Sequence, residues 1–114
     1  MSDLRDRLLA RLRDAEQQLA DLGRVHAEIV AASRDSNADD EHDPEGATIA
    51  FERQQVVALT EQAQATRTDL ERALQLLDEG AYGVCERCGR PIGEGRLEAR
   101  PAARTCLDCA AARR

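Results

Sequence analysis

The sequence predicts a mainly α-helical protein, in which a long antiparallel helical hairpin of coiled-coil type precedes a small C-terminal lobe organised by four cysteines. Three observations lead to this prediction. Two long stretches repeat apolar residues with a heptad rhythm, an acidic segment separates them, and all four cysteines fall between residues 85 and 109. We therefore expect residues 1–79 to form the hairpin, with its tip at about residues 35–46, and residues 80–114 to form the lobe.

The first predicted helix runs from Asp3 to about Ser33, a stretch with no proline and one glycine. Its apolar or semi-apolar positions alternate in steps of four and three, as they do along the seam of a coiled coil. These positions are Leu8, Leu12, Ala15, Leu19, Leu22, His26 and Ile29. A histidine on the seam is expected to set the register of the two helices rather than to bind a ligand.

The second predicted helix repeats this rhythm and has recognisable ends. Its seam positions are Val56, Leu59, Ala63, Thr66, Leu70, Ala73 and Leu77. The helix start is marked by an aspartate that can act as a cap, a proline at the first helical position and a glutamate in the first turn, which are Asp43, Pro44 and Glu45. The helix should end near Glu79, because Gly80 readily adopts the left-handed conformation that terminates helices.

The two seams can face each other if the chain folds back on itself. When the numbers of facing residues sum to about 85, Leu8 lies opposite Leu77 and the reversal centres on His42 and Asp43. Pairing with the helices of a second chain would use the same seams and stays an alternative.

The net charge of −6 belongs to one short segment of the chain. Six acids lie in it without any arginine, and they are Asp35, Asp39, Asp40, Glu41, Asp43 and Glu45. The other sixteen acids are balanced by sixteen arginines, and there is no lysine. This distribution argues against a general electrostatic attraction to nucleic acid and for a localised acidic feature at the predicted tip.

No apolar run approaches the length that spans a membrane, and the first twelve residues alternate charges with leucines instead of forming the apolar core of a signal peptide. We therefore expect a cytoplasmic protein that does not associate with membranes. Thiols stay reduced in that compartment, so the cysteines are better candidates for metal ligands than for disulfides.

The cysteines form two pairs, Cys85 with Cys88 and Cys106 with Cys109, and each pair encloses two residues. This is the spacing of a structural zinc site with four thiolate ligands, and Gly89 suits the tight turn after the first pair. Two disulfides, an iron site or redox-active pairs are the alternatives. Four thiolates leave no coordination position for water, so we expect one structural zinc ion and no hydrolytic centre.

The remainder of the lobe is rich in glycine, arginine and proline between Ala81 and Thr105, which suits turns and short strands, and a short helix starting around Cys106 should carry Arg113 and Arg114. The seven arginines of the lobe outnumber its four acids, and such a surplus allows contacts with nucleic-acid phosphates. However, the zinc–thiolate unit itself carries about −2, and no aromatic residues are interleaved with a basic cluster. A DNA-binding zinc ribbon is therefore the less favoured alternative.

Other sites and enzymatic activity are not supported by the residue pattern. Asp35, Asn37 and Asp39 match the first ligands of an EF-hand loop, but Asp40 then occupies the position of the turn glycine and Gly46 that of the bidentate glutamate. No nucleophile–histidine–acid set, phosphate-binding glycine loop or nucleotide fingerprint is present. We therefore predict that the protein is not an enzyme.

The zinc lobe resembles that of the DksA/TraR family of bacterial four-cysteine zinc-finger proteins. The resemblance covers about residues 77 to 110 and rests on residues that coincide in order and spacing. They are the run Leu77-Asp78-Glu79-Gly80-Ala81-Tyr82-Gly83-Val84-Cys85-Glu86-Arg87-Cys88-Gly89, then Ile92, Arg96, Leu97, Pro101, and the run Cys106-Leu107-Asp108-Cys109. The preceding helical hairpin is similar to the family in architecture only.

The resemblance implies a function. Members of this family bind bacterial RNA polymerase and insert the coiled-coil tip through its secondary channel toward the catalytic magnesium, often together with a guanosine alarmone. By resemblance, Asp40 and Asp43 are the tip acids, because they reproduce the spacing of the family's Asp-x-x-Asp-x-Ala motif, in which Glu45 replaces the alanine. The implied protein is a transcription regulator without base-specific DNA contacts; a zinc-stabilised adaptor for another partner is the alternative.

Overall fold

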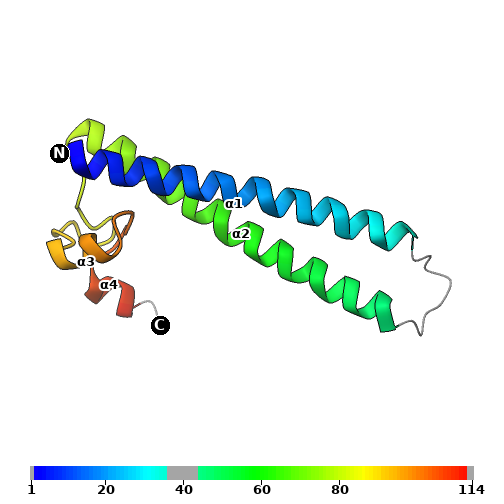
Figure 1. The fold of residues 1–114 in the computed structure, drawn as a ribbon. Coiled ribbons are helices and arrows are strands. Elements are labelled where there is room, and N and C mark those ends of the chain that lie inside the picture. Colours follow the sequence, from blue (N-terminus) through cyan, green and yellow to red (C-terminus); the bar gives the residue numbers. More distant parts are fainter. Residues whose placement is uncertain (1, 36–43, 113–114) are drawn as a thin grey trace. The chain divides into compact units, whose positions relative to one another are not determined.

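The computed structural model describes residues 2–35 and 44–112 of the chain. Four helices follow one another along the described chain (Figure 1). They are α1 (Ser2–Asp35), α2 (Pro44–Glu79), α3 (Glu94–Ala99) and α4 (Leu107–Ala112). The mainly helical fold, with a helical hairpin and a four-cysteine lobe, is the one that the sequence predicts.

The chain falls into two compact units. One unit combines residues 1–14 with residues 66–114, and the other consists of residues 15–65. The first unit therefore holds the beginning of α1, the end of α2 and the whole C-terminal lobe. The second unit holds the remaining parts of α1 and α2.

The end of α2 shows how local sequence chemistry fixes a helix boundary. Gly80 adopts a φ of 72°, which few residues other than glycine reach without strain. The N–H of Gly80 donates to the carbonyl of Leu77 at 3.2 Å, and the N–H of Ala81 donates to that of Leu76 at 2.8 Å. These two bonds form a Schellman motif, which satisfies carbonyls that the helix itself leaves unpaired. The predicted end at Glu79 and the predicted start at Pro44 are both confirmed, whereas the capping role of Asp43 lies outside the described residues.

Burial along α1 confirms the predicted seam. Leu8 and Ala15 are buried, with 0% and 4% of their surface exposed, and the other five predicted seam residues are half-buried. His26 is among the half-buried residues, as its seam position predicts. Apolar burial along this one stripe is what holds so charged a helix against its neighbour.

On α2 the predicted seam is correct at five positions and wrong at two. Val56, Ala63, Leu70, Ala73 and Leu77 are buried. Leu59 is 45% exposed and Thr66 is also exposed, while Thr60 and Arg67 are half-buried in their place. An undistorted helix has 3.6 residues per turn, whereas the heptad repeat assumes 3.5. The buried positions can therefore shift by one residue along the helix relative to the ideal repeat. The Thr60 hydroxyl donates to the Val56 carbonyl at 2.7 Å, which satisfies its polar group on the half-buried side.

An ion pair shows the antiparallel pairing of the helices within the first unit. Arg5, near the start of α1, contacts Asp78, near the end of α2. The buried residue Leu8 lies three positions after Arg5, and the buried residue Leu77 lies one position before Asp78. The two helices of this unit therefore pair within one chain, with a register close to the predicted one.

The C-terminal lobe contains one helix that the sequence did not predict. Helix α3 (Glu94–Ala99) lies in the region expected to form turns and short strands. Between residues 80 and 112 the strand-like pairing is limited to an isolated antiparallel bridge between Val84 and Pro91, so the expectation of short strands is wrong. The predicted terminal helix is present as α4, although Arg113 and Arg114 lie outside the described residues. None of the described helices combines the length and the apolar character needed to cross a membrane.

Candidate metal centre

The first cysteine pair lies on a tight backbone turn, which we call the knuckle (residues 85–90). The Cys85 N–H donates to the Arg90 carbonyl at 2.8 Å, and the Gly89 N–H donates back to the Cys85 carbonyl at 2.9 Å. Gly89 has a φ of 76°, so the predicted requirement for glycine at this turn is confirmed. These bonds fold the chain so closely that the two cysteines of the pair belong to one small loop.

The second cysteine pair lies at the start of α4. Cys106 immediately precedes the helix, and Cys109 lies in its first turn. The Ala110 N–H donates to the Cys106 carbonyl at 3.0 Å, so Cys106 already belongs to the first helical hydrogen bond. A spacing of three residues at a helix start directs the two side chains to the same side.

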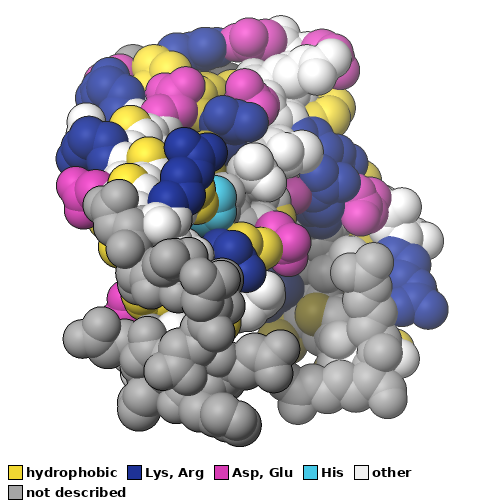
Figure 2. All heavy atoms as spheres, turned by 90° about the vertical axis from the view of Figure 1, so that its right-hand side faces the viewer, with side chains coloured by type: hydrophobic (Ala, Val, Ile, Leu, Met, Phe, Trp, Pro, Cys, Tyr) yellow, Lys and Arg dark blue, Asp and Glu magenta, His cyan; other side chains and the backbone are white. Residues whose placement is uncertain are grey.

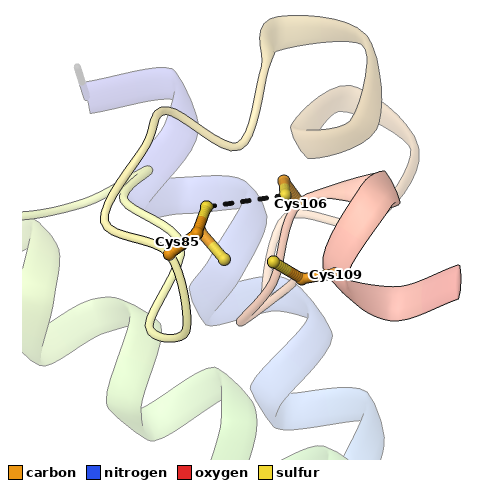
Figure 3. A group of neighbouring side chains, drawn as sticks. Cys85, Cys106 and Cys109 are labelled. Atoms are coloured by element: carbon orange, nitrogen blue, oxygen red, sulfur yellow. Dashed lines mark hydrogen bonds between the residues drawn. The ribbon is translucent and has the colours of Figure 1, made fainter. Parts of the chain in front are cut away.

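The structure brings the four predicted ligands together. All four sulfur atoms lie within 4.8 Å of one another, and those of Cys88 and Cys106 are 3.8 Å apart. Figure 3 shows the side chains of Cys85, Cys106 and Cys109 converging from the knuckle and from α4. Zinc–sulfur bonds of about 2.3 Å in a tetrahedron give sulfur–sulfur distances of roughly 3.8 Å.

The donor set and its spacing therefore fit one structural zinc ion, as predicted. All four cysteines are free thiols, so the disulfide alternative is not realised. When bound, zinc supplies a positive centre that links the knuckle to α4, and four sulfur ligands leave it no site for substrate or water.

The surroundings of the site shift the pKa values of Cys85 and Cys109 in opposite directions. Burial raises the pKa of Cys85, but the backbone N–H groups of Cys88, Cys106 and Arg87 outweigh it and lower that pKa to about 6. Hydrogen bonding with the Cys106 side chain, followed by burial, raises the pKa of Cys109 to about 12. Within this folded arrangement Cys85 therefore ionises more readily than Cys109, whose proton the charge of the metal has to displace.

A small group of buried residues supports the loops around the cysteines. Cys85, Ile92, Pro101 and Thr105 are buried. The Tyr82 hydroxyl donates to the Pro101 carbonyl at 2.7 Å. Three of these five residues lie between the two cysteine pairs, so the connection that joins the pairs is fixed at several points. This core is nevertheless small, which agrees with a lobe that depends on metal for its stability.

Charged side chains join the knuckle to helix α2. Arg104 contacts Asp69 of α2 at 2.6 Å and Glu86 of the knuckle at 3.5 Å, and Arg72 of α2 contacts the same Glu86 oxygen at 3.2 Å. Sequence reasoning missed these contacts and counted Arg104 only as surplus positive charge. The one available signal was that Asp69 and Arg72 have opposite charges and share a face of α2.

The surface charges do not gather into one basic area on the face shown in Figure 2. Arginine and acidic side chains are interspersed over the described surface visible there. This pattern agrees with the balanced charge that the sequence predicts outside the acidic segment. The predicted tip acids Asp40 and Asp43 lie outside the described residues, so their roles stay predictions.

Comparison with known proteins identifies the C-terminal lobe. Residues 80–114 match the family described as prokaryotic dksA/traR C4-type zinc finger. This segment is similar to the zinc finger of the DksA/TraR family. The assignment agrees with the resemblance inferred from the sequence, and we refer to residues 80–114 below as the finger.

Curated relatives are similar to this chain mainly over the finger. The RNA polymerase-binding transcription factor DksA of Escherichia coli is 48% identical over 40 residues, which are 35% of this chain and 26% of the relative. The uncharacterized protein YteA of Bacillus subtilis is 38% identical over 72 residues, which are 63% of this chain and 30% of YteA. The matched part thus spans less than a third of either relative's length.

A solved structure shares the fold over nearly the whole chain. The transcription factor DksA2 from Pseudomonas aeruginosa superposes with a TM-score of 0.76 and covers 98% of this chain and 81% of its own. The two sequences are 23% identical. The two proteins therefore share a fold, a helical hairpin followed by a small C-terminal lobe.

Proposed function

We propose that this protein binds bacterial RNA polymerase and regulates transcription. The observation that carries the proposal is the DksA/TraR zinc finger, which here follows a helical hairpin that shares the fold of DksA2. Proteins with similar fingers in Escherichia coli and Haemophilus influenzae are named RNA polymerase-binding transcription factors. We further propose that Cys85, Cys88, Cys106 and Cys109 hold the zinc ion.

The mode of action that we propose is insertion of the segment between α1 and α2 into the secondary channel of the polymerase. Six acids lie between Asp35 and Glu45 without a balancing arginine, and Asp40 and Asp43 have the spacing of the family's tip motif. Carboxylates close to a catalytic magnesium ion can compete for its ligands or perturb neighbouring protein groups. Such an effect requires no chemistry by this protein.

The same proposal places the protein in the cytoplasm and makes duplex DNA a less favoured partner. Arg104 is engaged by Asp69 and Glu86, and the Arg96 side chain donates to the Thr105 carbonyl at 2.7 Å. These two arginines are therefore less available for phosphates than their number in the sequence suggests. We expect weak affinity for duplex DNA even at low salt.

Retention by purified polymerase tests the proposal. Immobilised core RNA polymerase should retain the zinc-loaded full-length chain, and a column carrying an unrelated acidic protein serves as the control. A photo-crosslinker at position 42, in place of His42, should then mark residues that line the secondary channel. Failure to be retained would leave the adaptor alternative. Retention with crosslinks on another surface would keep the partner and reject the channel.

A further inference from the structure

Four charged residues form a continuous chain from helix α2 to the two halves of the metal site. We call Asp69, Arg104, Glu86 and Arg72, in this order of contact, the ion-pair chain. Its charges alternate in sign, and its three contacts measure 2.6, 3.5 and 3.2 Å. Asp69 and Arg72 are three residues apart on α2, so both lie on the helix face that meets the finger.

Each half of the metal site contributes one member of the ion-pair chain. Glu86 lies between the ligands Cys85 and Cys88, and Arg104 lies two residues before Cys106. The backbone joins the halves at the same place, because the Glu86 N–H donates to the Arg104 carbonyl at 2.9 Å. Glu86 and Arg104 can therefore meet only when the two cysteine pairs are side by side.

The ion pairs are too exposed to hold this arrangement alone. Their side chains retain between 30% and 40% of their solvent exposure, and isolated pairs of this kind contribute little to stability. Seventeen residues separate Cys88 from Cys106, and closing a flexible loop of that length is unfavourable unless another interaction compensates for it. A zinc ion bound by both pairs supplies that compensation.

We propose that the ion-pair chain is a metal-dependent clamp that orders the end of α2. Zinc brings Glu86 and Arg104 together, and the two residues then fix Asp69 and Arg72 of the helix. Loss of zinc separates Glu86 from Arg104 and releases the helix face between residues 66 and 79, while the unit of residues 15–65 keeps its own seam. Metal occupancy of the finger thus controls the order of the hairpin at its finger end, whether or not polymerase is bound.

Hydrogen–deuterium exchange of the full-length chain tests the clamp. We compare zinc-loaded protein with protein stripped by a chelator at the same pH. Amides in residues 66–79 should exchange about tenfold faster without zinc, because several half-exposed pairs are lost together. Amides in residues 46–65 should exchange at the same rate in both samples. Equal exchange of residues 66–79 with and without zinc would overturn the proposal.

Two variants separate the clamp from a general loss of finger structure. Asp69→Asn and Arg104→Gln should keep one zinc per chain and still speed exchange in residues 66–79. Arg5→Gln is the matched control, because it removes an ion pair at the same end of α2, that with Asp78, without touching the finger. Should R104Q bind less zinc, D69N decides, since Asp69 lies on α2. If zinc slows the exchange of residues 66–79 by the same factor in D69N as in R5Q, the ion-pair chain is not the clamp.

Discussion

The finger and the helical unit of residues 15–65 are stabilised by different means. The helical unit buries apolar side chains along one stripe of each helix, with Ala15, Val56 and Ala63 almost fully covered. The finger has a buried group too small to balance the entropy of its ordered loops, and it gathers four thiols instead. The comparison teaches that one short, charged chain can use two sources of stability, and that each should respond to its own perturbation.

The largest expected effect is the loss of a metal ligand. Cys88→Ser should abolish stoichiometric zinc binding and unfold the finger, because a hydroxyl is a poor replacement for a thiolate ligand. Residues 15–35 and 44–65 should keep their helical structure. Metal analysis and site-resolved hydrogen exchange measure both outcomes. Arg87→Gln is the matched control within the knuckle and should retain zinc; full zinc retention by C88S would remove Cys88 from the ligand set.

A seam substitution should affect the helical unit instead. Val56→Ala removes buried methyl groups and should lower the free energy of unfolding by about 2 kcal/mol, including the cavity it leaves. Leu59→Ala removes more atoms from a side chain that is 45% exposed and should cost less than about 1 kcal/mol. Urea denaturation of the two zinc-loaded variants measures the difference. If both substitutions lower the free energy of unfolding equally, Leu59 lies in the contact between the helices and the ideal heptad seam is correct.

Proton release on zinc binding sharpens the description of the finger. Against the effect of burial, the backbone N–H groups of Cys88, Cys106 and Arg87 lower the pKa of Cys85 to about 6 in the folded finger, but the two cysteine pairs separate when zinc is lost. Without zinc this thiol should therefore be mostly protonated at pH 7, and zinc binding should release about four protons. Calorimetry in buffers of different ionisation enthalpy counts these protons. Release of clearly fewer protons at pH 7 would mean that the cysteine pairs stay together without zinc and that Cys85 is already ionised.

The comparison also explains what the sequence could predict. The ends of α2 and the turn at Gly89 depend on single residues, because proline and glycine restrict or extend the backbone locally. The cysteine spacing likewise carries the chemistry of the site. Helix α3 has no such signal: it spans six residues, contains no buried residue and is contacted from α1, where the Arg7 side chain donates to the Glu98 carbonyl at 3.3 Å.

The seam shift and the ion-pair chain were missed because both depend on contacts in the folded protein and not on single residues. A repeat of four and three fits both Leu59 and Thr60, and only the packing of the neighbouring helix selects the residue that is covered. Asp69 and Arg104 are 35 positions apart, so their contact depends on the folded finger. Tertiary contacts of this kind leave no periodic pattern in the sequence.

The smallest effect on folding is expected in the acidic segment, which belongs to neither source of stability. Asp43→Asn keeps a side chain that caps helices as well as aspartate does, so the free energy of unfolding should change by less than about 0.5 kcal/mol. It removes one of the two carboxylates of the proposed tip motif, so the effect on transcription by purified polymerase should weaken. Asp39→Asn removes the same charge outside the motif and is the matched control. If D43N regulates transcription as the unmodified protein does, or if D39N weakens regulation equally, the motif does not act through Asp43, and general negative charge or another surface carries the function.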